Sequence, residues 1–241
     1  MLVFAHRGLH NRHVSENTLA AFGRAVETGA DGIEFDLRVS RDGVPVAIHD
    51  EGLHRVAGDS RRVRDLTAEE LQAVALRGEG RIPTLNDITS AVPPPVMFDM
   101  EIKDRDVLDP LITKLQTSAG LRERTIVSSF VLDDLLKVME AVPGIRTALL
   151  FRRWPLPLRG RAVWGHLGTQ GIWAFGFRAA GLNRRRVRSL QRRGWKVAAW
   201  DEQPLKKEAR KIMKLGVDIA IVFKADKPSS ASRNDGRVVL P

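Results

Sequence analysis

Two histidines and two carboxylates lie within or directly after short apolar runs in the first fifty residues. His6 and His49 each close such a run, and Glu34 and Asp36 lie inside another. Imidazole titrates near neutral pH, so both histidines are candidates for a general acid or base. A single histidine at the end of a strand is often structural, but two beside a carboxylate cluster favour a catalytic role.

A cluster of carboxylates is expected because residues two apart on a strand point to the same face. Glu34 and Asp36 form one such pair, and Asp99, Glu101 and Lys103 form another set. Carboxylates gathered this closely repel one another unless a cation neutralises them, and hard divalent ions such as Mg²⁺ or Ca²⁺ prefer oxygen ligands. The competing interpretation is a structural ion-pair network in which basic residues supply the positive charge.

Arg7 and Lys103 would place positive charge beside that ion, which suits a phosphate group. A cation site, two proton-transfer groups and anion-binding side chains together favour metal-assisted phosphodiester cleavage over other reaction classes. The remaining histidines are expected to be structural or to face solvent; these are His10, His13, His54 and His166.

These side chains need a scaffold that brings strand ends together. Apolar runs alternate with amphipathic helical patterns through about eight units, which predicts an α/β fold, a (β/α)₈ TIM barrel. The expected strands cover residues 2–5, 32–39, 44–49, 96–102, 125–128, 145–151, 172–175, 196–200 and 218–223. The expected helices cover residues 17–28, 84–91, 107–119, 131–141, 184–193 and 205–215.

The chain is expected to form a single barrel domain over residues 1–226, without a linker that divides it. An Asp42-Gly43 turn predicts that the runs 32–39 and 44–49 form a hairpin-like extension. Residues 51–83 then interrupt the alternation and are interpreted as a small insertion at the rim, after the second strand. The tail, residues 227–241, lacks a pattern and is expected to be mobile.

Composition limits the remaining choices. The chain has 241 residues, of which 43% are hydrophobic, enough for one substantial core. Its net charge of +10 favours anionic partners, although an arginine-rich composition with solvated faces explains it equally well. Cysteine is absent, so disulfides and thiolate chemistry are excluded. The first apolar run follows Met1 directly and leaves no room for a signal peptide, so we expect a cytoplasmic location.

The order and spacing of several motifs resemble the glycerophosphodiester phosphodiesterase family, whose barrel is similar to that of phosphatidylinositol-specific phospholipases C. The matching stretches are Ala5-His6-Arg7-Gly8, Glu16-Asn17-Thr18, residues 29–36, Asp42-Gly43, Ile48-His49-Asp50, residues 82–85, Glu101-Ile102-Lys103, Ser129-Phe130, Trp200 and Gly216-Val217-Asp218. They extend through almost the whole chain.

The resemblance implies a set of roles for residues of this chain. It implies acid–base catalysis by His6 and His49, binding of one divalent cation, Mg²⁺ or Ca²⁺, by Glu34, Asp36 and Glu101, and substrate or phosphate contacts from Arg7, Lys103 and Trp200. It also accounts for the stretch 51–83, where the family carries a small insertion over one side of the barrel mouth.

The chain departs from the family pattern at a few places near the mouth. Asp201-Glu202-Gln203 stands where Thr-Val-Asn is common, and Val222-Phe223 stands where Thr-Asp often ends the last strand, with an aspartate only at Asp226. Asp99 replaces the usual asparagine, and Ser15 the usual proline. No presumed catalytic group is lost, so these changes bear on specificity before activity.

The leading prediction is hydrolysis of a glycerophosphodiester to glycerol 3-phosphate and an alcohol, an activity of glycerol and lipid metabolism. A second hypothesis is cleavage of a lysolipid or other lipid diester, as a lysophospholipase D or phospholipase C does, at an anionic membrane. It rests on the Trp- and Arg-containing loop 151–168 and the basic helices 184–193 and 206–214, although a short helix packed against the barrel is the favoured interpretation of the loop.

A third hypothesis is a catalytically silent barrel that binds phosphate-containing ligands. The retained histidines and acidic residues argue against it. Nucleic acid is not an expected partner, because no recognition motif accompanies the basic helices.

Overall fold

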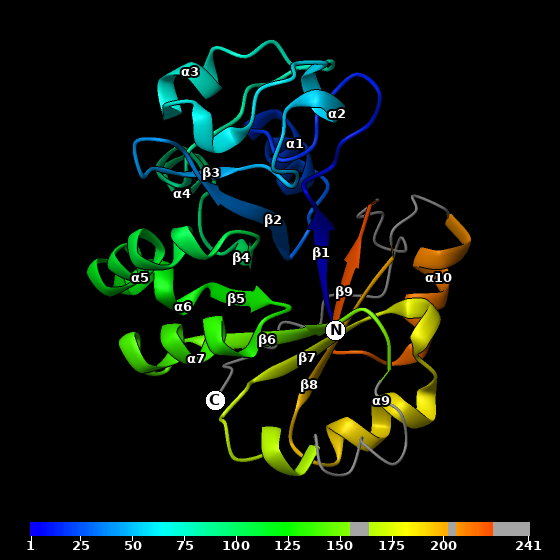
Figure 1. The fold of residues 1–241 in the computed structure, drawn as a ribbon. Helices are drawn as coiled ribbons and strands as arrows, with labels where there is room; N and C mark the ends of the chain where they lie inside the picture. The colour runs from blue at the N-terminus through cyan, green and yellow to red at the C-terminus, as the bar shows by residue number, and fades with distance from the viewer. Residues whose placement is uncertain (155–163, 202–205, 224–241) are drawn as a thin grey trace.

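The computed structural model describes residues 1–154, 164–201 and 206–223 of the chain. The strands are β1 (Leu2–His6), β2 (Gly32–Val39), β3 (Pro45–Ala47), β4 (Met97–Ile102), β5 (Thr125–Ser129), β6 (Arg146–Phe151), β7 (Ala174–Arg178), β8 (Lys196–Trp200) and β9 (Ile219–Val222). Parallel strands follow the order β1-β9-β8-β7-β6-β5-β4-β2, and pairing of β1 with β2 closes the sheet into the predicted (β/α)₈ barrel (Figure 1).

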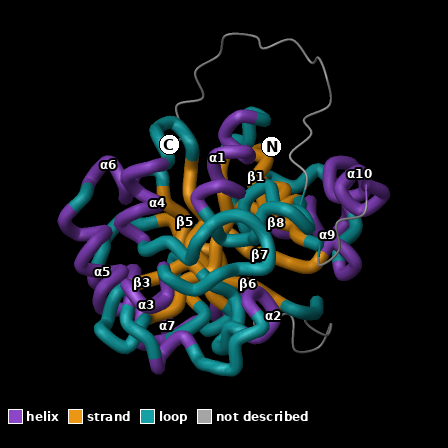
Figure 2. The backbone as a smooth tube through the Cα atoms, turned by 90° about the horizontal axis from the view of Figure 1, so that it is seen from above, coloured by secondary structure: helices purple, strands orange, loops and turns teal. Residues whose placement is uncertain are grey.

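Helices surround the strands, which lie in the centre when the molecule is seen from above (Figure 2). The α-helices are α1 (Leu19–Glu27), α2 (His54–Ala57), α3 (Ala68–Gln72), α4 (Leu85–Ala91), α5 (Leu108–Thr117), α6 (Ala119–Glu123), α7 (Leu132–Ala141), α9 (Arg184–Gln191) and α10 (Lys206–Leu215). Short 3₁₀ helices are η1 (Val63–Asp65), η2 (Arg105–Val107) and η3 (Ala179–Gly181).

Two sequence-based boundaries need correction. The helix expected over residues 107–119 is two helices, α5 and α6, because Ser118 adopts an extended backbone with φ −133° and ψ 94°. The strand expected over residues 172–175 begins at Ala174 and continues to Arg178, where it pairs with β6 and β8. Because β7 extends to Arg178, this residue lies at the mouth of the barrel.

The register of neighbouring strands sets the position of the polar residues. His6 of β1 pairs with Glu34 of β2. On the other side of β2, Glu34 pairs with Asp99 and Asp36 pairs with Glu101 of β4. Because paired residues on parallel strands point to the same side, three strands deliver their ionisable side chains to one end of the barrel.

Aromatic and small residues fill the other end of the barrel. Phe4 is fully buried, and its ring lies 2.7 Å from the position that a Cβ of Gly32 would take. Small side chains on successive strands, Ala148, Ala174 and Ala198, belong to the same cluster. The interior is therefore a packed core rather than a channel, and open space remains only toward the mouth.

The insertion after the hairpin forms a small layer on β3, with a core of its own that includes Val46, Ile48, Leu53 and Leu71. The predicted hairpin is present, since β3 pairs antiparallel with the end of β2. The Thr67 capping box that opens α3 is also present. The domain limits at residues 226 and 227 stay predictions, because residues 224–241 lie outside those described.

Two tryptophans of the loop 151–168 pack inward. Trp164 is 8% exposed and contacts Phe175, while Trp154 lies 5.1 Å from Phe177 between ring centroids. These contacts support the interpretation that the loop packs against the barrel, and they turn both rings away from the surface where a membrane anchor would need them. Residues 155–163 lie outside the described part. Among the described helices, each is too short or too polar to cross a bilayer.

Candidate active site

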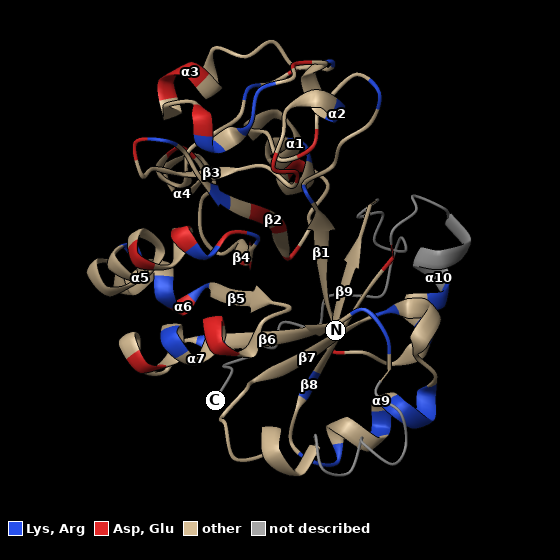
Figure 3. Cartoon of the chain, viewed as in Figure 1, with Lys and Arg blue, Asp and Glu red and all other residues tan. Residues whose placement is uncertain are grey.

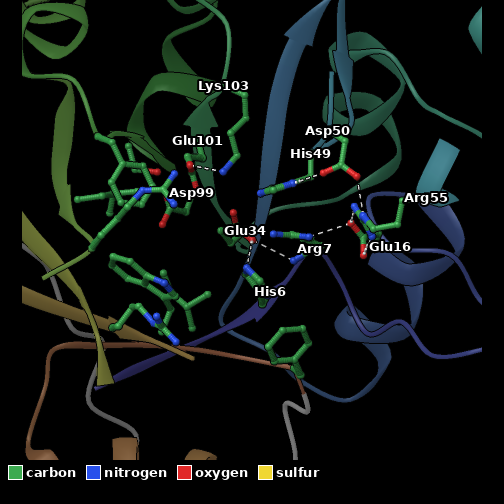
Figure 4. Close-up of a pocket in the computed structure, with 18 residues that line it drawn as sticks. His6, Arg7, Glu16, Glu34, His49, Asp50, Arg55, Asp99, Glu101 and Lys103 are labelled. Atoms are coloured by element: carbon green, nitrogen blue, oxygen red, sulfur yellow. Dashed lines mark hydrogen bonds and ion pairs between the residues drawn. The ribbon is translucent and has the colours of Figure 1, made fainter. Parts of the chain in front are cut away.

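A pocket of about 450 Å³ opens at the carboxyl ends of the barrel strands (Figure 4). Its lining contains seven of the eight residues predicted for the site: His6, Arg7, Glu34, His49, Glu101, Lys103 and Trp200. The eighth, Asp36, lies fully buried directly beneath them and contacts Arg7 and Lys103. All eight predicted side chains are thus brought to one place.

The loop after β1 holds Arg7 in an unusual backbone conformation. Arg7 has φ 54° and Asn17 has φ 55°, both in the left-handed region that non-glycine residues rarely adopt. Gly8 follows with φ 78°, and a Cβ there would approach the Ala21 backbone to 2.8 Å. Such strain concentrates at functional sites, and here it turns the Arg7 guanidinium back over the barrel mouth.

Three carboxylates meet below the mouth. Oxygen atoms of Glu34, Asp36 and Glu101 all lie within 4.8 Å of one another, and all three side chains are buried. Burial and the neighbouring Asp36 charge raise the pKa of Glu34 well above its usual range. The same two causes raise the pKa of Glu101 to about 7. When fully ionised, the cluster would therefore hold more negative charge than its surroundings neutralise.

Two basic side chains counter part of that charge. Arg7 Nε lies 3.1 Å from Asp36 Oδ2, and Lys103 Nζ lies 3.2 Å from Asp36 Oδ1. Burial opposes ionisation of Asp36, but the charges of Arg7 and Lys103 outweigh it and lower the pKa of Asp36. Lys103 also forms an ion pair with Glu101. The ion-pair interpretation is therefore correct for Asp36 and Glu101, whereas among the described residues Glu34 pairs only with His6, which is neutral.

The donor set fits a hard divalent cation. Glu34 Oε2 accepts a hydrogen bond from the Arg7 backbone N–H at 3.0 Å, whereas its buried Oε1 has no hydrogen-bond partner among the described residues. Three carboxylates at coordinating spacing, one with a free buried oxygen, match the oxygen ligands of Mg²⁺ or Ca²⁺. The site therefore has both the ligand type and the excess negative charge that such an ion requires.

The two histidines flank the carboxylates in different surroundings. His6 is buried at the end of β1, with Nε2 3.8 Å from Glu34 Oε2. Burial and the Arg7 charge lower the pKa of His6 to about 3. His49 is half-buried, and its Nδ1 lies 2.6 Å from Asp50 Oδ1. Burial lowers the pKa of His49 as well, and the Asp36 charge and the Asp50 contact oppose that shift. His6 is therefore neutral at neutral pH and able to accept a proton.

Four further polar residues organise the rim and were not predicted as site residues. Asn17 donates to Asp36 Oδ2 at 2.8 Å, and Glu16 accepts from Arg7 NH1 at 2.9 Å. Arg55 donates to both Glu16 and Asp50. The sequence signals for three of them were present but weak. Glu16 and Asn17 belong to a matching motif that directly precedes a helix, and Asp50 directly follows His49.

The wall opposite these charges is largely aromatic and aliphatic. Phe130, Leu150, Trp200, Ile221 and Phe223 line it, together with the arginines 152 and 178. Trp200 packs over Gly176, where a Cβ would come within 3.1 Å of its ring, and meets Phe130 edge to face at 5.9 Å. Sequence patterns cannot separate such residues from ordinary core residues, because their strands are apolar on both faces.

Two departures from the family pattern contribute to the pocket. Phe223 packs its ring edge against His6, with centroids 4.6 Å apart, and so takes part in excluding water from that imidazole. Asp99 lines the pocket floor, where burial raises its pKa to about 7. Asp226 and residues 202–203 lie outside the described part of the chain.

The other histidines are placed as expected. His10 is half-buried with its ring 5.6 Å from Phe223, and it stays outside the carboxylate cluster. The remaining three, His13, His54 and His166, are exposed.

Comparisons with known proteins agree with this geometry. Residues 6–227 match the family model described as the glycerophosphoryl diester phosphodiesterase family. A glycerophosphodiester phosphodiesterase of Caldanaerobacter subterraneus subsp. tengcongensis is 37% identical over 179 residues, which cover 67% of this chain and 73% of that protein.

Solved structures show the same architecture. The crystal structure of a glycerophosphodiester phosphodiesterase from Thermotoga maritima superposes with a TM-score of 0.78 at 28% identity, covering 94% of this chain and 96% of that one. A phosphodiesterase from Oleispira antarctica, in complex with the product sn-glycerol-3-phosphate, gives a TM-score of 0.77 at 22% identity and covers 92% and 93% of the two chains. At that identity the second match shows the fold alone.

Proposed function

The chain belongs to the glycerophosphoryl diester phosphodiesterase family, and from that premise we propose that its pocket hydrolyses glycerophosphodiesters by histidine acid–base catalysis at a divalent-cation site. The family is one of phosphoric diester hydrolases, so an enzyme is favoured over a silent phosphate-binding barrel. The observation that carries the proposal is the convergence of two histidines, three carboxylates and two basic side chains at one barrel mouth.

The two histidines would exchange protons with the two oxygens that change partners at phosphorus. His6 is neutral and buried, which suits it to take the proton of the nucleophile as the new P–O bond forms. The Asp50 carboxylate at His49 Nδ1 stabilises the imidazolium form of His49, which suits it to protonate the leaving alkoxide as the old P–O bond breaks. One water is consumed overall, and glycerol 3-phosphate and an alcohol are released.

The charged residues would bind and orient the phosphate. Glu34, Asp36 and Glu101 would hold Mg²⁺ or Ca²⁺, which supplies Lewis-acid polarisation of phosphoryl oxygens when bound. Arg7 and Lys103 reach the same space and would offset the charge that develops on those oxygens. Trp200 and Phe130 would enclose the glycerol or alcohol portion and exclude water from it.

A substrate panel tests this proposal directly. Glycerophosphodiesters with different alcohols are incubated with the protein after chelation and after addition of Mg²⁺ or Ca²⁺, and release of glycerol 3-phosphate is measured. We expect activity with an added ion and its loss on chelation. Absence of glycerol 3-phosphate release from every diester with either ion would refute the proposal.

A second candidate substrate is a lysophospholipid or related lipid diester, met at an anionic membrane. The segment 179–196, which includes α9, carries seven Lys and Arg and no Asp or Glu. Its basic residues colour α9 blue in Figure 3, and Lys211 and Lys214 of α10 are also exposed. Such a surface is attracted to acidic headgroups through several charges at once. The apolar pocket wall would accept the first part of an acyl chain.

Co-sedimentation with vesicles tests the membrane contact separately from hydrolysis. We expect binding to vesicles rich in phosphatidylglycerol at low salt, and loss of binding in the double variant Arg185→Glu, Arg188→Glu. Equal recovery with neutral phosphatidylcholine vesicles, or equal binding by the variant, would contradict it. A cytoplasmic location stays a prediction.

A further inference from the structure

Arg55 joins the insertion to both sides of the active site. We propose that Arg55 is a positioning residue that fixes the orientation of His49 and Arg7, so that the insertion completes the site rather than covering it. This inference rests on the proposed function, because it assigns a role in the same reaction. Arg55 lies on α2, a four-residue helix of the insertion, and its side chain reaches the rim of the pocket.

The guanidinium of Arg55 binds two carboxylates at once (Figure 4). Its Nε donates to Asp50 Oδ2 at 2.6 Å. NH1 and NH2 donate to the two oxygens of Glu16 at 2.9 and 2.7 Å. One planar group thus forms a bidentate pair and a third hydrogen bond, a geometry that arginine offers and that lysine lacks.

Each of these carboxylates continues to a residue of the reaction. The other oxygen of Asp50 lies 2.6 Å from His49 Nδ1, the contact that sets the orientation of the ring. Glu16 Oε1 accepts a hydrogen bond from Arg7 NH1 at 2.9 Å. Arg55 therefore connects the proton-transfer group on one side of the mouth with the phosphate-binding group on the other.

The electrostatic surroundings favour the ionised forms of both carboxylates that Arg55 binds. Burial opposes ionisation of Glu16, but hydrogen bonds from Arg55 and the charge of Arg7 outweigh it and lower the pKa of Glu16. The pKa of Asp50 is lowered for a similar reason: burial opposes ionisation, and Arg55 and His49 outweigh that. Without Arg55, the carboxylates of Glu16 and Asp50 would lose the cation that binds both of them. Among the residues that the structure describes, Glu16 would then interact only with Arg7, and Asp50 only with His49.

A purely structural role is the competing explanation, since Arg55 also ties α2 to the barrel. Arg61 offers a matched control on the same insertion. It forms a bidentate ion pair with Asp59, in which Nε donates to Oδ1 at 3.1 Å and NH2 donates to Oδ2 at 2.6 Å, and it is absent from the pocket lining. Removing Arg61 takes away a comparable ion pair from the insertion and leaves the site contacts in place.

The test compares Arg55→Gln, Arg55→Lys and Arg61→Gln with the wild type on one glycerophosphodiester. We expect kcat/KM of Arg55→Gln to fall roughly 10- to 100-fold, mainly through kcat, since misplacement of a reacting group by about 1 Å costs on that order. Arg55→Lys restores charge without the planar fork and should recover only part of the loss. Arg61→Gln should stay within about twofold of the wild type.

A second readout separates positioning from mere stability. His49 faces Asp36, Arg7, Lys103 and Asp50. Loss of the Arg55 charge leaves Asp50 freer to stabilise the imidazolium, so the pKa of His49, followed by NMR of its ring, should move upward in Arg55→Gln. It should not move in Arg61→Gln.

The outcomes are distinguishable. If Arg55→Gln keeps wild-type kcat and the same His49 titration, the inference is wrong while the proposed function stands. If the wild type itself releases no glycerol 3-phosphate, the proposed function fails, and the His49 titration alone then decides whether Arg55 positions the ring. Equal losses in both arginine variants, with unmoved titrations, would assign Arg55 a structural role only.

Discussion

The first 150 residues and the last 91 differ sharply in charge and in what they bring to the pocket. The first part carries 18 Lys and Arg against 23 Asp and Glu, and the last carries 21 against 6. The ion pairs of Arg7, Arg55 and Lys103 at the barrel mouth all come from residues 6–103 of the acidic part. The later strands contribute mostly apolar rings and branched chains. Under the proposed function, reaction chemistry would fall mostly to the first part of the chain and substrate shape mostly to the second.

The two parts also differ in how their side chains are held. In the acidic part, Arg7, Asp36 and Lys103 position one another through ion pairs. In the later part, Trp200 is held by contact with Gly176 and Phe130. Changes in the first part should therefore act mainly on kcat, and changes in the second mainly on KM.

The largest effect should come from the histidines. His6→Ala and His49→Ala should each lower kcat by about 10²- to 10⁴-fold, the usual value of positioned acid–base catalysis. An activated ester with a 4-nitrophenol leaving group needs no protonation of its leaving oxygen. His49→Ala should therefore lose much less activity on that ester than His6→Ala does. A similar loss in both variants on both substrates would overturn the assignment of His49 as the acid.

A ligand change in the acidic part should come next. Glu101→Gln should weaken binding of Mg²⁺ or Ca²⁺ by more than about 100-fold, since loss of an outer-shell partner alone costs roughly 10- to 100-fold. Titration calorimetry of the chelated protein measures this without reference to activity. Glu69→Gln on the exposed face of α3 is the matched control and should bind like the wild type. Unchanged affinity in Glu101→Gln would remove Glu101 from the ligand set.

A change in the later part should be milder and of another kind. Trp200→Ala should raise KM roughly tenfold and leave kcat within about threefold, because removal of an apolar contact surface costs about 1–3 kcal/mol of binding. Trp173→Ala, outside the pocket, serves as the control for loss of an indole. A collapse of kcat in Trp200→Ala would show that the two portions are not separable in function.

The smallest effect should appear in stability. The pKa values of Asp99 and Glu101 are raised to about 7 in the folded chain, whereas unfolded carboxylates are already ionised near pH 5. Folding therefore binds protons, and this contribution is lost as pH rises through 7. The pKa of His6 is lowered, so the unfolded chain binds a proton at His6 that the folded chain does not, and this opposing contribution fades as pH rises above the ordinary value of 6.5.

Thermal unfolding of the chelated protein measures this dependence. We expect Tm to fall by about 2–4 °C between pH 6.5 and 8.5, since each kcal/mol shifts Tm by about that amount in a chain of this size. Saturating Mg²⁺ should reverse the trend, because the ion binds only ionised carboxylates. A flat profile in the absence of metal would contradict the raised pKa values.

The fold and the charged part of the site follow from local sequence. Alternation places Glu34 and Asp36 on one face of β2, and Asp99 and Glu101 on one face of β4. The position of His6 at the end of an apolar run indicates that it lies at the mouth of the barrel. What sequence cannot supply is strand register. The pairing of His6 with Glu34 depends on how β1 slides against β2, which is set by packing of Phe4 against Gly32.

Other features were missed for different physical reasons. Arg55 lies in an insertion without periodicity, on a helix of one turn, so nothing local indicates that its side chain reaches Glu16, which is 39 residues earlier. Leu150 and Ile221 lie on strands buried on both faces, where pocket and core residues have the same composition. The inward packing of Trp154 and Trp164 was the favoured interpretation of their loop, but its aromatic partners on β6 and β7 could not be named from the sequence.

The first strand of the barrel has its hydrogen-bonding partners at opposite ends of the chain. Leu2 to Ala5 pair with residues 219–222 of β9 on one edge, and β2 takes the other edge. During synthesis on the ribosome, the residues around His6 therefore emerge long before β9, and one edge of their strand stays unpaired until β9 is made. Truncated translation products that stop before β9 should expose this edge and be recognised by chaperones and proteases as unfinished.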